Sequence, residues 1–97
     1  MTAEQSNSGA DRVALIESRL REAFAPGKVG VRDDSYLHAG HEGAKSGGGH
    51  FAVTVVSTRF QGKSALQRHQ MIYQALGDMM KQDIHALSIQ ALAPEEV

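Results

Sequence analysis

The chain has 97 residues, with 10 Lys and Arg against 11 Asp and Glu, a net charge of −1 and no cysteine. This length leaves room for one domain with one core, and the nearly balanced charge gives no electrostatic reason to expect tight, sequence-independent binding to nucleic acid. Because cysteine is absent, a disulfide framework is excluded, and any metal site must use histidine, carboxylates or a partner's thiols.

The N-terminal segment reads MTAEQSNSGAD and lacks the basic start and apolar core of a signal peptide. No apolar run approaches the roughly 18 residues that span a membrane. We therefore expect a cytoplasmic protein without membrane contact. The small, polar residues 1–8 are predicted to form a disordered tail, and residues 9–97 a single domain.

Five segments carry the periodicity of regular secondary structure. In two of them apolar residues recur every three or four positions, as on one face of a helix, and in the other three they follow strand patterns. The pattern predicts, in chain order, a helix over 10–25, strands over 28–35 and 50–58, a helix over 65–81 and a strand over 84–92. The second strand is apolar on both faces and is expected to be central, and a last helical turn is predicted to begin at Pro94.

The second predicted helix gathers most of its apolar residues on one stripe, which is expected to face the core. The residues of this stripe are Leu66, His69, Ile72, Tyr73, Leu76, Met79 and Met80. His69 is interpreted as a partly buried structural histidine, and Arg68 is expected on the opposite, solvent-facing side.

The strand order predicts where the histidines meet. The first two strands form an antiparallel hairpin, and the helical crossover makes the third strand parallel to the second. Both later strands then begin at the edge where the hairpin loop lies. We therefore expect His50 and His85 on one edge of the sheet, with the loop residues His38 and His41 within reach.

The segment HAGHEGAKSGGGHF, residues 38–51, allows two interpretations. Neutral imidazole is a good ligand for zinc, copper or iron and can take the place of thiolate on an iron-sulfur cluster. The alternative is a long hairpin loop with solvated histidines. For His85 the alternative is a strand-edge residue that is hydrogen-bonded to a neighbouring backbone group. The spacing matches no standard mononuclear metal motif.

The segments DDSYLHAGH, HFAVTVVSTRFQGKSALQRHQMIY and IHALSI occur in this order, and together they resemble the BolA family over about two-thirds of the chain. The helix that precedes them matches as well, while Gln70 stands where the family usually has arginine. The resemblance implies an α+β domain of αββαβ order, a class II KH-like fold whose helices pack on one face of a three-stranded mixed sheet.

The resemblance also implies a function. BolA-like proteins pair with monothiol CGFS-type glutaredoxins, either without metal or around a bridging 2Fe-2S cluster that the glutaredoxin cysteine and glutathione hold on the other side. Carried over to this chain, the histidine of the I-H-A segment is His85. The second ligand is a loop residue, for which His41 matches best and His50 and His38 are the alternatives.

A second branch of the family acts in transcription regulation, and the KH-like turn and helix start would then meet DNA phosphates. The residues of this predicted nucleic-acid face are Arg59, Lys63, Ser64 and Arg68. A third possibility is a small adaptor that binds its partner without metal. No nucleophile supports an enzyme, and the free protein is expected to be a monomer or weak homodimer.

Overall fold

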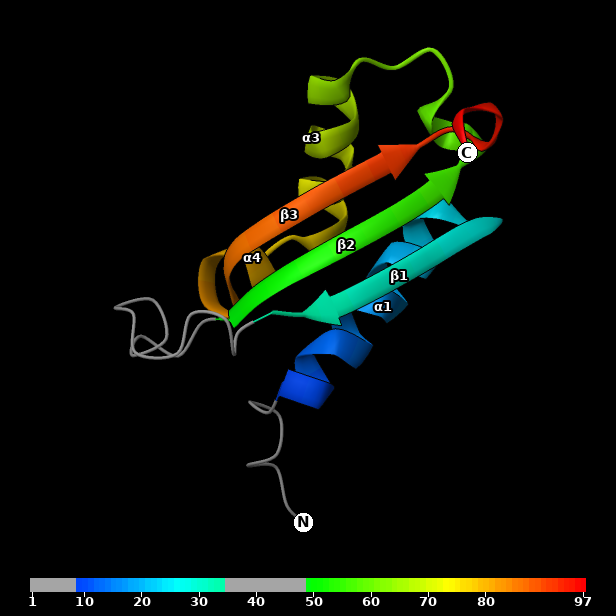
Figure 1. Cartoon of the computed structure of the whole chain (residues 1–97). Helices are drawn as coiled ribbons and strands as arrows, with labels where there is room; N and C mark the ends of the chain where they lie inside the picture. The colour runs from blue at the N-terminus through cyan, green and yellow to red at the C-terminus, as the bar shows by residue number, and fades with distance from the viewer. Residues whose placement is uncertain (1–8, 35–48) are drawn as a thin grey trace.

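The computed structural model describes residues 9–34 and 49–97, so the predicted tail and the loop residues His38 and His41 lie outside the described residues. The chain folds in αββαβ order with short additional helical turns (Figure 1). The elements are α1 (Gly9–Phe24), β1 (Gly27–Asp33), β2 (Gly49–Ser57), η3 (Thr58–Phe60), α3 (Ala65–Leu76), α4 (Met79–Gln82), β3 (Ile84–Leu92) and η4 (Pro94–Glu96).

The sheet has the predicted topology. Its order is β1-β2-β3, with β1 antiparallel and β3 parallel to the central strand β2. The alternation along β2 sends Phe51, Val53 and Val55 into the core, where each is at most 2% exposed. Both α1 and α3 contribute buried side chains to this same core, so the helices cover one face of the sheet and leave the other open (Figure 1).

The prediction of one continuous helix over 65–81 is wrong. The helix α3 ends at Leu76, and Gly77 follows with φ of 56°, a positive value that glycine adopts without the steric cost of a Cβ atom. Arg19 of α1 donates a 2.8 Å hydrogen bond to the carbonyl of Leu76, which satisfies one of the acceptors left open at the helix end. The chain then resumes as the short helix α4, which leads directly into β3.

The predicted apolar stripe of α3 is also wrong in part. Ile72 and Leu76 are fully buried, but Leu66 is 67% and Tyr73 is 42% exposed. The Arg68 side chain, expected in solvent, is only 12% exposed. The helix is therefore turned so that Arg68 faces the sheet, which is possible because its guanidinium finds hydrogen-bond partners there.

The end of β2 is joined to the first helix through polar and aromatic contacts. The buried Ser57 hydroxyl donates to the Phe24 carbonyl at 3.0 Å and accepts from the backbone N–H of Arg59 at 3.1 Å. Phe60 is fully buried, with its ring centroid 4.9 Å from that of Phe24. These contacts fix the turn that leads into α3.

Candidate functional site

His50 and His85 lie side by side where β2 and β3 begin, as the strand order predicts. Their ring centroids are 5.1 Å apart and their planes are inclined by 41°. The proximity of these two histidines, which are 35 positions apart in the sequence, is thus confirmed. His69 lies on α3, partly buried.

A register shift brings the two imidazoles together. Gly49 pairs with Ile84, whereas the next residue of β2, His50, pairs with Ala86. His85 falls between these pairs as the extra residue of a β-bulge, a feature that re-aims a side chain at the end of a sheet. Ile84 can therefore stay in the core while His85 is exposed beside His50.

Backbone bonds hold this edge of the sheet in place. The N–H of Asp34 donates to the His50 carbonyl at 2.7 Å, and the N–H of Gly49 donates to the Asp83 carbonyl at 3.1 Å. The Asp83 carboxylate is also 3.6 Å from the Arg12 guanidinium of α1. His50 is partly buried, with its Nε2 atom shielded from solvent, whereas His85 is exposed, so the pair combines two differently accessible imidazoles on a fixed backbone.

The donor set suits one side of a shared metal site. Neutral imidazole is a borderline ligand that iron accepts, alone or beside thiolates. The described part of the chain contains no group of three or more His, Cys, Asp or Glu side chains that could hold a metal ion by itself. A metal ion held by these two imidazoles would therefore need further ligands from outside the described residues.

The predicted nucleic-acid residues divide into two groups. Arg59 and Lys63 are exposed on the turn before α3. Ser64 is the N-cap of α3: its hydroxyl accepts from the Gln67 N–H at 3.1 Å, while the Gln67 side chain accepts from the Ser64 N–H at 2.8 Å. This capping box gives Ser64 a structural role at the helix start.

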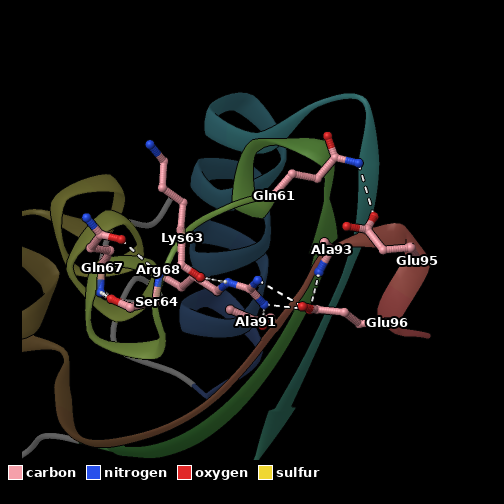
Figure 2. Close-up of polar contacts among 9 residues, drawn as sticks. All are labelled: Gln61, Lys63, Ser64, Gln67, Arg68, Ala91, Ala93, Glu95 and Glu96. Atoms are coloured by element: carbon pink, nitrogen blue, oxygen red, sulfur yellow. Dashed lines mark hydrogen bonds and ion pairs between the residues drawn. The ribbon is translucent and has the colours of Figure 1, made fainter.

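The Arg68 side chain forms hydrogen bonds with Glu96 of the η4 turn (Figure 2). Its Nη1 and Nη2 atoms donate to the two carboxylate oxygens of Glu96 at 2.6 and 3.0 Å. Further hydrogen bonds of 3.0 Å each run to the carbonyls of Lys63 and Ala91. The guanidinium also lies over the Phe60 ring, 5.9 Å from its centroid. Sequence patterns do not pair Arg68 with Glu96, because 28 positions and a strand separate them.

The Glu96 carboxylate responds to this pairing. The hydrogen bond from Arg68, and after it the one from the Ala93 N–H, lowers the pKa of Glu96 from 4.5 to about 2. The same hydrogen bond raises the pKa of Arg68. The folded state therefore favours the charged form of Glu96 more strongly than the unfolded chain does.

We expect the Arg68–Glu96 contact to make the free energy of unfolding depend on pH. Because the folded pKa lies below the unfolded one, the contribution of Glu96 is complete above pH 4.5 and is lost as the pH falls toward about 2. Urea unfolding of the wild type and Glu96→Gln should differ most at neutral pH and converge at low pH. A difference that stays constant down to the lowest pH would contradict this.

The fold and its edge histidines define a class of small αββαβ domain, and the sequence identifies the family. The family of BolA-like proteins matches residues 20–96, so the chain belongs to the BolA family. The BolA domain of SufE1 from Arabidopsis thaliana has the same fold, with 43% identity and a TM-score of 0.77 over 89% of this chain and 95% of that one.

The curated relatives carry different names. The Escherichia coli "DNA-binding transcriptional regulator BolA" is 41% identical over 84% of this chain and 74% of its own length. Human "BolA-like protein 1" is 41% identical over 86% of this chain. The chain spans 58% of that human relative and 28% of the Arabidopsis "SufE-like protein 1". None of the helices in the described segments is long and apolar enough to cross a membrane.

Proposed function

We propose that this protein is a non-enzymatic partner of a monothiol glutaredoxin and supplies two histidines to a shared 2Fe-2S cluster. The observation that carries the proposal is the His50–His85 pair, whose ring centroids are 5.1 Å apart on one edge of the sheet. Membership of the BolA family supports it, because the resemblance to that family implies the same histidine of the I-H-A segment as a ligand.

The two imidazoles have different roles in this proposal. His85 is exposed and accessible to a partner, whereas His50 is partly buried and, because its Nε2 atom is shielded, would bind as the second ligand through Nδ1. His41 and His38 remain alternatives for the second position. The bound cluster would supply a redox-active, transferable iron-sulfur unit, and the chain's own contribution is to present neutral nitrogen donors from a fixed strand edge.

Reconstitution tests the proposal directly. The protein is mixed with a monothiol glutaredoxin, glutathione, ferrous iron and sulfide, and the product is examined by native mass spectrometry and by visible circular dichroism. We expect a heterodimer that carries a 2Fe-2S cluster, with a spectrum different from that of the glutaredoxin alone. A heterodimer without cluster would favour a metal-free adaptor, and the absence of any heterodimer would refute the partnership.

A DNA-binding role is the second candidate. It is favoured by bacterial relatives named "DNA-binding transcriptional regulator BolA" and by the exposed Arg59 and Lys63. If Lys63 contacts a phosphate, Lys63→Ala should weaken binding to duplex DNA and lower the slope of log affinity against log salt by about 0.9. Fluorescence anisotropy at several salt concentrations measures both quantities. Lys81→Ala, on the exposed surface of α4, is the matched control. Equal affinities and salt slopes for the two variants would count against DNA binding at Arg59 and Lys63.

A further inference from the structure

Glu96 occupies the side of Arg68 that an external anion would use. The two carboxylate oxygens accept from Nη1 and Nη2 at 2.6 and 3.0 Å, a forked arrangement that phosphate oxygens also adopt with arginine (Figure 2). Oε1 of Glu96 accepts in addition from the Ala93 N–H at 2.8 Å. The chain's own carboxylate thus satisfies donors that could recognise a phosphodiester.

Arg68 keeps its position independently of Glu96. Its Nε and Nη1 atoms donate to the carbonyls of Lys63 and Ala91, each at 3.0 Å, and its guanidinium lies over the buried Phe60 ring. These contacts come from the turn before α3 and from β3, and they do not involve the last turn of the chain. If Glu96 leaves, the two freed N–H groups therefore stay aimed in the same direction.

The turn that carries Glu96 is held mainly by polar contacts at the surface. The η4 turn has no buried residue, and Ala93, just before it, is the buried residue that anchors it. Besides the Glu96 contacts, Gln61 donates to the Glu95 carboxylate at 3.0 Å. Exposed hydrogen bonds and ion pairs add little net stability, so this turn can open at small cost while the core stays folded.

We infer that Arg68 forms an anion site that the chain closes from within, and that a phosphate of duplex DNA takes the place of Glu96. This inference rests on the DNA-binding candidate function. The exposed Lys63 and Arg59 would hold neighbouring phosphates, and the Lys63 side chain extends away from Glu96 in Figure 2. Binding to DNA would then require opening of η4, so Glu96 and the DNA phosphate compete for the Arg68 guanidinium.

The test compares two variants that remove the same charge. Glu96→Gln weakens the closing contact at Arg68, whereas Glu95→Gln removes one negative charge beside it and keeps an acceptor for Gln61. Affinity for a labelled, mixed-sequence DNA duplex is measured by anisotropy across a salt series. We expect Glu96→Gln to bind about tenfold more tightly than Glu95→Gln. The salt slopes of the two variants should be equal, because a phosphate contacts Arg68 in both complexes and only the cost of displacing residue 96 differs.

Arg68 itself supplies the next comparison. In the Glu96→Gln background, Arg68→Ala should cancel the gain in affinity and lower the salt slope by about 0.9, because one phosphate contact is lost. Equal affinities for Glu96→Gln and Glu95→Gln would show that Glu96 does not compete with DNA for Arg68. If DNA binding in that case still depends on Lys63, the DNA-binding candidate stands without that competition; if no variant binds DNA, both are refuted.

The wild type provides a measurement that does not depend on how any variant folds. The Ala93 N–H is bonded to Glu96, so its amide exchange should accelerate when duplex DNA is added. Gly77, whose N–H donates to the Tyr73 carbonyl at 2.9 Å at the other end of α3, serves as the internal reference and should keep its exchange rate. An Ala93 amide that stays equally protected in the DNA-bound protein would contradict the displacement of Glu96.

Discussion

Replacing His85 with alanine should abolish the visible absorption and circular dichroism of a cluster shared with the glutaredoxin. The reason is that His85 is the exposed imidazole of the pair, and alanine offers no donor in its place. Because the side chain is exposed, the variant should fold normally, with a melting temperature close to that of the wild type. The loss should therefore be specific to the cluster.

Two further substitutions serve as a control and as a test of the second ligand. His69→Ala removes an imidazole from α3, away from the sheet edge, and should leave the spectrum of the heterodimer unchanged. His50→Ala should alter the spectrum if His50 is the second ligand, and should leave it intact if a loop histidine has that role. An unchanged spectrum for His85→Ala would remove the I-H-A histidine from the proposed site.

The strands and the histidine pair were predictable because their signals are local and their topology is restricted. The third strand was expected over 84–92 and occupies Ile84–Leu92, and the other strands agree within two residues. Two strands joined by a helical crossover in one sheet are usually parallel, and the connection is almost always right-handed. His50 and His85 start those two strands, so their proximity followed from strand order alone. The bulge that turns His85 toward His50 depends on register, which no pattern in the sequence specifies.

The second helix was predicted less well because its apolar residues are more numerous than its buried face. Leu66 and Tyr73 extend the helical periodicity but lie outside the contact with the sheet. Gly77 could have marked the helix end, since glycine commonly follows the last helical residue. The apolar residues Met79 and Met80 beyond it continued the same stripe and concealed the break.

The role of Arg68 could not be predicted from the sequence. A charged residue on a helix is usually exposed, and burial of its side chain requires several acceptors that the fold must bring together. Those acceptors come from Lys63, Ala91 and Glu96, which belong to three different parts of the chain. A residue expected to meet DNA therefore contributes first to the folded structure, and any contact with phosphate competes with that contribution.

Replacing Phe60 with alanine should destabilise the domain by about 3–5 kcal/mol, the usual cost of truncating a buried phenylalanine. Phe60 is fully buried between the Phe24 ring, 4.9 Å away, and the Arg68 guanidinium. Alanine would leave a cavity at the junction of α1, the η3 turn and α3. Since small domains have about 5–15 kcal/mol of total stability, this variant should be close to unfolding.

Urea denaturation followed by far-ultraviolet circular dichroism measures this loss. Leu66→Ala is the matched control, because Leu66 lies on α3 but is 67% exposed, and its truncation should change stability by less than about 0.5 kcal/mol. A similar small change for Phe60→Ala would mean that the turn before α3 is not held through the core. In that case the position of Arg68, and with it the closed anion site, would depend on the polar contacts alone.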